Sequence, residues 1–315
     1  MKLTDSIFQD ADEARAFMER ERWPHGPVCP HCGNVDRAKI TELQGAKHRA
    51  GLYQCAECRE QFTVTVGTVY ERSKIPLNKW LAAIFLMNAG KKGTSAHQIH
   101  RMIGVTYKTA WFMCHRIRES MRQEGLEPMG GGGKIVEADE TYYGKPDKPR
   151  VSPRRVKEGR PYIKGDKNRN NRPVLALVER GGRVRSFHVP VADAASVAQI
   201  VRDNIHRETR LHTDESRLYP VVGKEFAKHE TVNHSAKEYA RGDVTTNTVE
   251  TYFSVFKRGM RGTYQHCKEK HLHRYLAEFD FRFNHRAALG FTDGERAAIA
   301  IRNSGGKRLT YRPSH

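Results

Sequence analysis

Two Cys-X-X-Cys pairs limit what the N-terminal part of this chain can form. Cys29 and Cys32 make the first pair, Cys55 and Cys58 make the second, and 22 residues separate the two pairs. Each pair forms a tight turn that directs two thiolates toward one ion, so two pairs complete a tetrahedral site. Four thiolates leave no open position for water, so we expect one structural Zn²⁺ in residues 23–70.

The cysteine content and the composition also indicate the compartment. Only two of the six cysteines lie outside the two pairs, a pattern typical of metal binding in a reducing compartment rather than of a secreted disulfide framework. Apolar residues make up 38% of the chain, and no apolar run approaches the length of a membrane span. The N-terminus mixes charges and lacks the apolar stretch of a signal peptide. We therefore expect a cytoplasmic, nucleoid-associated protein with no membrane partner.

The net charge of +19 is concentrated in two segments. Residues 71–128 carry 10 Lys/Arg against 4 Asp/Glu, and residues 145–172 carry 11 against 3. Basic stripes of this kind bind phosphate backbones, so a nucleic acid is the predicted partner. Ordinary solubility charge or an anionic membrane is the alternative, and no basic helix here has a strong apolar face for lipid. The predicted DNA contacts are Lys108, Arg116 and Arg118 in the first segment, Arg154, Arg155 and Lys157 in the second, and Lys257 and Arg258 further along the chain.

The segments on either side of the cysteine pairs are predicted to be helical. Residues 1–22 have one weakly apolar face, and residues 71–128 contain three helical patterns at 78–89, 94–103 and 106–121. Gly104 separates the last two patterns. Two short helices joined by a glycine-containing turn favour a helix-turn-helix, and an ordinary helical bundle is the alternative.

The pattern changes to α/β after the glycine run 130–133, which we interpret as a flexible joint. Strands are expected at 134–143, on both sides of a Gly-Gly turn at 181–182, and around LHTD, which ends at residue 214. A strong helix is expected at 246–260. We therefore predict an α/β catalytic domain over 134–290, followed by a peripheral tail over 291–315.

Three carboxylates suggest catalysis. Asp139 lies within the first of these strands, Asp214 ends a later strand, and Glu250 lies on the helix 246–260. Carboxylates delivered in this way can bind two divalent cations that support in-line phosphoryl transfer. Lys257 is seven residues after Glu250, so it shares a helix face with it and is expected to position a phosphate. Glu137 shares a strand face with Asp139, whereas Glu140 and Glu215 point the other way and are interpreted as bystanders.

The chain resembles bacterial insertion-sequence DDE transposases of the zinc-ribbon subgroup, which are relatives of the eukaryotic Merlin elements. The matching stretches cover roughly residues 25–290 and are highly specific together. They are CPHCGN, YQCAECREQFTVTVGTVYERSKIPLNKW, KIVEADETYYGK, LHTDES, TNTVETYFSVFKRGMRGTYQHC and KHLHRYLAEFDFRFNHR.

The resemblance implies a ribonuclease-H-like fold with Asp139, Asp214 and Glu250 as the catalytic triad. It also implies two Mg²⁺ or Mn²⁺ ions as cofactors and the terminal inverted repeats of an element as substrate, together with target DNA. Asn247, one turn before Glu250, is an alternative third ligand. A homodimer or larger assembly is expected, because two element ends must be held together.

Two other classes of protein share some of these features. A non-enzymatic zinc-ribbon and helix-turn-helix regulator would bind DNA without cutting it, and it leaves the three carboxylates unexplained. A nuclease on the same fold would cut strands without joining them.

Overall fold

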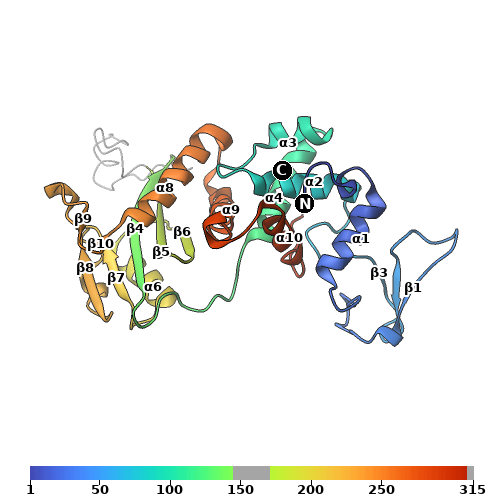
Figure 1. The fold of residues 1–315 in the computed structure, drawn as a ribbon, viewed down its shortest axis with the longest axis horizontal. Coiled ribbons are helices and arrows are strands. Elements are labelled where there is room, and N and C mark those ends of the chain that lie inside the picture. The colour runs from blue at the N-terminus through green and yellow to red at the C-terminus, as the bar shows by residue number, and fades with distance from the viewer. Residues whose placement is uncertain (145–170, 311–315) are drawn as a thin grey trace, which may run out of the picture. The chain divides into compact units, whose positions relative to one another are not determined.

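The computed structural model describes residues 1–144 and 171–310, and the chain divides into two compact units. Unit 1 combines residues 1–122 with the C-terminal segment from residue 290, and unit 2 spans residues 123–289 (Figure 1). The predicted DNA contacts Arg154, Arg155 and Lys157 lie outside the described residues. No helix within the two described ranges is long and apolar enough to cross a membrane.

Unit 1 contains a group of α-helices around the apolar helix α2. Its helices are α1 (Ala11–Arg22), α2 (Leu77–Ala89), α3 (Ala96–Ile103), α4 (Tyr107–Met121) and α10 (Asp293–Arg302). Trp80, Leu81, Ile84 and Met87 of α2 are almost fully buried. Both α1 and α4 begin at residues whose side chains accept backbone N–H bonds, Asp10 and Thr106 respectively, so their starts are fixed locally. The buried face of α2 makes this helix the core element of unit 1.

A small antiparallel sheet of unit 1 carries the second cysteine pair. Its strands are β1 (Ile40–Glu42), β2 (Tyr53–Cys55) and β3 (Gln61–Phe62), in the order β1-β2-β3. The ring of Trp23 meets the rings of Tyr53 and Phe62 edge-on, with centroids 5.4 and 5.9 Å away. This aromatic contact ties the sheet to the end of α1.

The C-terminal segment is part of the core of unit 1, so the prediction of a peripheral tail over 291–315 is wrong for its helix. Ala297, Ala300 and Ile301 of α10 are buried, and α10 packs against α1, α2 and α4. The backbone N–H of Val69 also donates to the carbonyl of Ser304 at 3.3 Å. The segment looked peripheral because alanines carry most of its buried face, which gives a weak apolar pattern in the sequence.

Two glycines of the run 130–133, which the sequence predicts to be a flexible joint, are hydrogen-bonded within unit 2. The backbone N–H of Gly130 donates to the carboxylate of Glu179 at 3.0 Å, and that of Gly131 donates to the hydroxyl of Thr209 at 2.9 Å. Gly130 has a φ of +82°, and a Cβ there would lie 2.2 Å from Thr209 Oγ1. Glycine is therefore required here for close backbone approach as well as for conformation.

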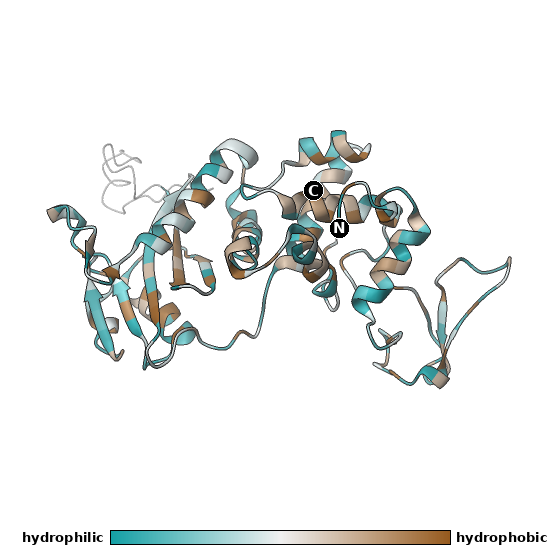
Figure 2. Ribbon diagram, in the orientation of Figure 1, coloured by the Kyte–Doolittle hydropathy of each residue, from teal (hydrophilic) through white to brown (hydrophobic). Residues whose placement is uncertain are grey.

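Unit 2 is built on a mixed five-stranded sheet with the order β6-β5-β4-β7-β8. The strands are β4 (Ile135–Tyr143), β5 (Arg172–Glu179), β6 (Val184–His188), β7 (Arg210–Thr213) and β8 (Lys228–Thr231). Strand β5 pairs antiparallel with both β4 and β6. Strand β7 pairs in parallel with both β4 and β8. Figure 2 shows a largely hydrophobic β5 and a hydrophilic β8, as expected for an inner and an edge strand.

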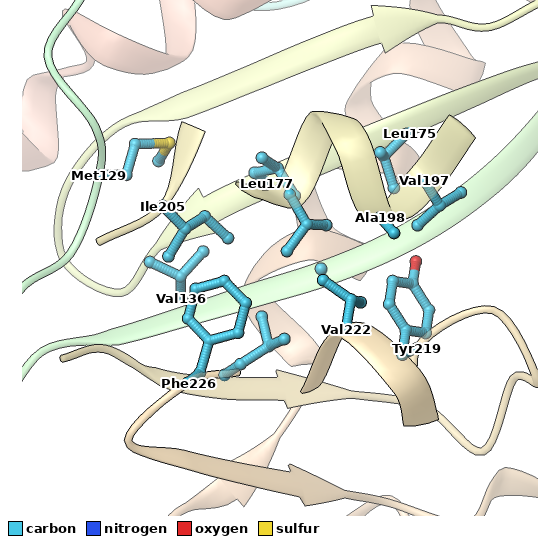
Figure 3. Close-up of a cluster of buried hydrophobic side chains, with 13 residues drawn as sticks. Met129, Val136, Leu175, Leu177, Val197, Ala198, Ile205, Tyr219, Val222 and Phe226 are labelled. Atoms are coloured by element: carbon cyan, nitrogen blue, oxygen red, sulfur yellow. The ribbon is translucent and has the colours of Figure 1, made fainter. Parts of the chain in front are cut away.

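Helices cover both faces of this sheet. On one face, α6 (Ala194–Asn204) and α7 (Pro220–Gly223) pack in a cluster that includes Val136, Leu177 and Val201 (Figure 3). On the other face, α8 (Asn247–Gly259) and α9 (Leu272–Asn284) pack through Val249, Phe256 and Leu276. A short hairpin of β9 (Ala240–Arg241) and β10 (Val244–Thr245) leads into α8. Unit 2 is thus a mixed α/β domain, as the sequence predicts.

Candidate metal centres and nucleic-acid interface

The four cysteines of the two pairs come together at one point. Their sulfur atoms all lie within 4.8 Å of one another, with Cys29 and Cys58 separated by 3.6 Å and Cys32 and Cys55 by 3.8 Å. Zn–S bonds of about 2.3 Å in a tetrahedron imply sulfur separations of about 3.8 Å. The donor set and its spacing therefore fit a structural zinc ion.

Neighbouring donors favour the thiolate form of Cys55. The backbone N–H of Cys58 and the side-chain amide of Asn34 both point to its sulfur, and they lower the pKa of this thiol to about 6. Thiolate, not thiol, is the ligand of zinc. Asn34 therefore supports the site from outside the ligand set, a role that its place two residues after Cys32 did not reveal.

The three predicted catalytic carboxylates come from three adjacent elements of unit 2. Asp139 lies in the middle of the central strand β4, and Asp214 follows directly after the parallel neighbour β7. Glu250 lies in the first turn of α8, which packs against β4. These positions agree with the strand, strand end and helix that the sequence predicts. The catalytic roles of these residues stay predictions.

The three carboxylates interact electrostatically. Burial, followed by the negative charges of Glu140, Asp214 and Glu250, raises the pKa of Asp139 to about 8. Burial lowers the pKa of Lys257, and the nearby charge of Asp139 opposes that shift. Lys257 is therefore within electrostatic range of Asp139, and its role in positioning a phosphate stays a prediction.

The carboxylates do not form a single-ion cluster as tight as that of the cysteines. Among the described residues, the four cysteines make the only group of three or more potential ligands whose atoms all lie within 4.8 Å. Two ions in a catalytic pair are themselves about 3.5–4 Å apart, so carboxylates that share two ions span a wider site. Hard carboxylate oxygens are the donors that Mg²⁺ prefers, so the donor chemistry fits such a pair.

Several polar residues around the carboxylates were missed at the sequence level. His234 lies 3.3 Å from the Glu250 carboxylate and 3.2 Å from the hydroxyl of Thr246. The same carboxylate accepts a bond from Thr246 at 3.0 Å. His234 did not stand out in the sequence, because it lies in a polar connection that folding brings next to Asp214 and Glu250. Thr246 begins the predicted helix 246–260, and the prediction did not include its contact with Glu250 one turn later.

The two predicted bystanders hold the connections around the site. Glu140 accepts bonds from Ser216 at 3.1 Å and Tyr219 at 2.7 Å, so it anchors the segment that follows Asp214. Glu215 accepts the backbone N–H of His234 at 2.9 Å and that of Ser235 at 3.0 Å. Glu140 also interacts electrostatically with Asp139 and Asp214, so it lies beside the candidate ligands and not away from them. The interpretation of both glutamates as bystanders to catalysis stays a prediction.

The three predicted DNA contacts on α4 differ in solvent exposure. Lys108 is exposed near the start of the helix. Arg116 and Arg118 are only 6% and 2% exposed, so the prediction that they contact DNA is wrong. Arg116 donates to the carbonyl of Glu71 at 2.6 Å and lies over the ring of Trp80. These arginines are off the apolar stripe, but neighbouring segments of unit 1 cover that side of α4 as well.

The raised pKa of Asp139 predicts a pH-dependent stability when no divalent cation besides zinc is present. The folded protein holds this proton more tightly than the unfolded chain, whose carboxyl has an ordinary pKa of 3.8. The contribution of Asp139 is fully present below that pH and is lost as pH rises through about 8. We expect Asp139→Asn to flatten the fall in unfolding free energy between these limits, measured by urea denaturation of zinc-loaded protein.

Asp203→Asn is the matched control for this titration, because Asp203 is an exposed carboxylate on α6. It should leave the pH dependence of unfolding as in the wild type. Parallel curves for the wild type and Asp139→Asn would show that Asp139 ionises normally in the fold.

Comparison with known proteins gives a match for each of two domains of the chain. Residues 9–61 match the model of a transposase zinc-ribbon domain, and residues 130–284 match that of an ISXO2-like transposase domain. A protein described as an "uncharacterized protein in transposable element ISH50" of Halobacterium salinarum is 29% identical over 281 residues, which cover 87% of this chain and 91% of that protein. An "uncharacterized transposase-like protein" of Haemophilus influenzae is 26% identical over 102 residues, 32% of this chain and 81% of that protein.

The two domain matches cover the two candidate centres separately. The zinc-ribbon match contains all four clustered cysteines, and the transposase match contains Asp139, Asp214 and Glu250. The chain therefore belongs to the transposase family that these two domain models describe.

Proposed function

We propose that the chain binds the terminal inverted repeats of a mobile element and carries out divalent-metal-dependent DNA cleavage and strand transfer. The observation that carries this proposal is the placement of Asp139 on β4, of Asp214 directly after the adjacent parallel strand β7, and of Glu250 on the first turn of the helix that packs against β4. Their electrostatic interaction, and that of Lys257 with Asp139, supports it. The family supports a transposase, and the proposal adds the chemistry and the residues that perform it.

The proposed catalytic domain has a ribonuclease-H-like fold. Its support is the mixed sheet with β4 at the centre and helices on both faces, which agrees with the fold that the sequence resemblance implies. In this arrangement a central strand and the end of its parallel neighbour deliver Asp139 and Asp214 from adjacent positions.

Within the proposed site, Asp139 and Asp214 would hold two Mg²⁺ or Mn²⁺ ions, and Glu250 would complete the ligand set. When bound, such a pair supplies activation of a water or 3′-hydroxyl and stabilisation of the leaving oxygen. The chain's own contribution is to orient its carboxylates and to offer Lys257 to a phosphate. Two successive displacements at phosphorus, cleavage and then joining, need no change in these residues.

The proposed end-recognition surface combines the zinc ribbon with a helix-turn-helix formed by α3 and α4. Gly104, with a φ of +64°, ends α3, and α4 begins at Tyr107, so the turn has three residues. The ring of Tyr107 stacks on that of His97 at 4.1 Å, and both residues are exposed. Residues at the start of the second helix contact base edges in such motifs, which favours Tyr107 and Lys108 as contacts.

A strand-transfer assay with end oligonucleotides tests this function. Purified protein is mixed with duplexes that carry the inverted repeats flanking the gene, with a supercoiled plasmid and with Mg²⁺ or Mn²⁺. We expect 3′-ends of the duplex to become joined to the plasmid, no product when Mg²⁺ and Mn²⁺ are left out of the zinc-loaded protein, and no product from scrambled ends. Sedimentation of the protein on paired ends should give a dimer or a larger assembly.

The same assay separates the two competing functions. Metal-dependent nicks that are never joined would make the chain a nuclease. Specific end binding without any cleavage would make it a regulator. Either result under conditions in which the protein is folded and zinc-loaded would overturn the proposed function.

A further inference from the structure

A buried glutamate on the central strand holds the start of the helix that carries Glu250. Glu137 has no exposed surface, although it carries an ionisable carboxylate. One of its oxygens accepts the backbone N–H groups of Thr248 and Val249 at 2.8 and 3.0 Å. The other accepts the hydroxyl of Thr248 at 2.9 Å. Glu137 therefore binds the first turn of α8 from a different element of the fold.

This contact replaces the usual cap of a helix. The first N–H groups of a helix lack partners within it, and an N-cap side chain normally accepts one from the second or third helical residue. The N-cap of α8, Thr246, makes no side-chain capping bond. Its hydroxyl donates to the Glu250 carboxylate instead. Because Glu137 caps α8 from β4, Thr246 is left to orient Glu250.

Arg180 holds the segment immediately before α8. Its guanidinium donates to the carbonyls of Asp243 and Thr245 at 2.7 and 3.2 Å, and it contacts Glu137 twice, at 2.8 and 3.1 Å. The backbone N–H of Arg180 also donates to the carbonyl of Ile135 on β4 at 3.0 Å. Arg180 therefore holds the chain before Thr246 by hydrogen bonds, and Glu137 holds the chain after it.

We propose that Glu137 and Arg180 are positioning residues that fix Glu250 and Asn247 relative to Asp139. Glu137 is two residues before Asp139 on the same strand face, about 7 Å along the strand. The first turn of α8 is thus hydrogen-bonded to the same strand that bears Asp139. This inference rests on the proposed function, because it assigns the pair to the geometry of the proposed metal site.

The chemistry requires a carboxylate at position 137. Five donor groups converge on its two oxygens, and a carboxylate accepts at both. Glutamine would direct its NH₂ group at N–H or hydroxyl donors in either orientation of the amide. We therefore expect Glu137→Gln to shift the first turn of α8 while nearly preserving side-chain volume.

The test is the affinity of the zinc-loaded full-length chain for Mn²⁺, measured by electron paramagnetic resonance and by calorimetry. Loss of a residue that orients metal ligands typically costs about 10- to 100-fold in metal affinity. We expect a fall of this size for Glu137→Gln, with DNA-end affinity unchanged when no Mg²⁺ or Mn²⁺ is added and cleavage partly restored at high Mn²⁺. Arg180→Lys keeps a cation but cannot hold both carbonyls, so it should show a smaller fall in the same direction.

Glu278→Gln is the matched control. Glu278 is also fully buried and pairs with an arginine, Arg282, but it lies on α9 and not against the first turn of α8. It should lose stability and keep the wild-type Mn²⁺ affinity and spectrum. Equal loss of affinity in this control would reduce Glu137 to a general structural role and overturn the proposal.

The remaining outcomes are also decisive. Wild-type Mn²⁺ affinity in a folded Glu137→Gln variant would overturn the proposed positioning role of Glu137. If that variant fails to fold, Arg180→Lys and Thr248→Val decide the matter, and wild-type affinity in both would overturn it. A wild-type chain that binds no Mn²⁺ at all would instead overturn the proposed metal site, a failure that is recognised before any variant is compared.

Discussion

Asp139→Asn and Asp214→Asn are each expected to abolish strand cleavage and strand transfer. Each replacement removes a charged oxygen that the proposed cation pair requires, while the side-chain volume is nearly unchanged. The loss should exceed the roughly 100-fold effect that is typical of an outer-shell partner, because these residues are proposed ligands. The measurement is the rate of joined-product formation with end oligonucleotides in Mg²⁺ and in Mn²⁺.

End binding should survive both replacements, because the proposed recognition elements lie in unit 1 and the carboxylates in unit 2. Asp203→Asn, on the exposed side of α6, is the control and should retain wild-type rates. Joined product from Asp139→Asn or Asp214→Asn at a rate near that of the wild type would remove these residues from the catalytic site.

The third ligand is resolved by comparing Glu250→Gln with Asn247→Ala. Both side chains are exposed and lie within the first turn of α8. The Glu250 carboxylate interacts electrostatically with Asp139 and accepts a bond from Thr246, which favours Glu250. Near-normal strand transfer by Glu250→Gln together with loss in Asn247→Ala would move the role to Asn247.

The elements that carry the carboxylates were accessible from sequence because their signals are local. Val249, Tyr252, Phe253 and Phe256 repeat at helical spacing, and all four are buried beneath α8. The strand of Asp139 and the strand that ends before Asp214 also lie where the apolar pattern predicts them. The zinc site could be predicted from the spacing of the two Cys-X-X-Cys turns alone, because each turn brings two thiolates together and two such turns complete a tetrahedral site.

The errors of sequence interpretation arise where distant segments meet. Arg116 and Arg118 look like surface residues from helical periodicity, which cannot show that other segments cover that side of α4. The role of α10 depends on a partner face on α2, some 200 residues earlier in the chain. The bonds of Glu137 to α8 span more than 100 residues, so no local pattern contains them.

Loss of zinc is expected to unfold the ribbon of unit 1. The ribbon strands are only two or three residues long, and few of the residues between the cysteine pairs are buried. Apparent zinc-binding free energies of about 10–16 kcal/mol in zinc-finger peptides match or exceed the roughly 5–15 kcal/mol that stabilises a typical domain. Elemental analysis should give about one zinc per chain in the wild type.

Cys55→Ser is the sharpest variant for this prediction. Cys55 is fully buried, is the end of β2 and pairs with Ile40 of β1, so its loss removes a ligand at the point where the sheet meets the ion. We expect the variant to lose zinc, to become sensitive to proteolysis between residues 23 and 70, and to bind element ends more weakly. The contact of Trp23 with Tyr53 and Phe62 should be lost with it, which near-ultraviolet circular dichroism detects.

Cys267→Ser provides the matched control, because Cys267 is a thiol in unit 2 outside the four-cysteine cluster. It should keep one zinc and full end affinity. A metal-free protein with a protease-resistant ribbon and wild-type end affinity would contradict the structural role of zinc. Since the ribbon packs on α1 through Trp23, destabilisation that spreads from residues 23–70 into α1 would further show that zinc supports unit 1 beyond its own turns.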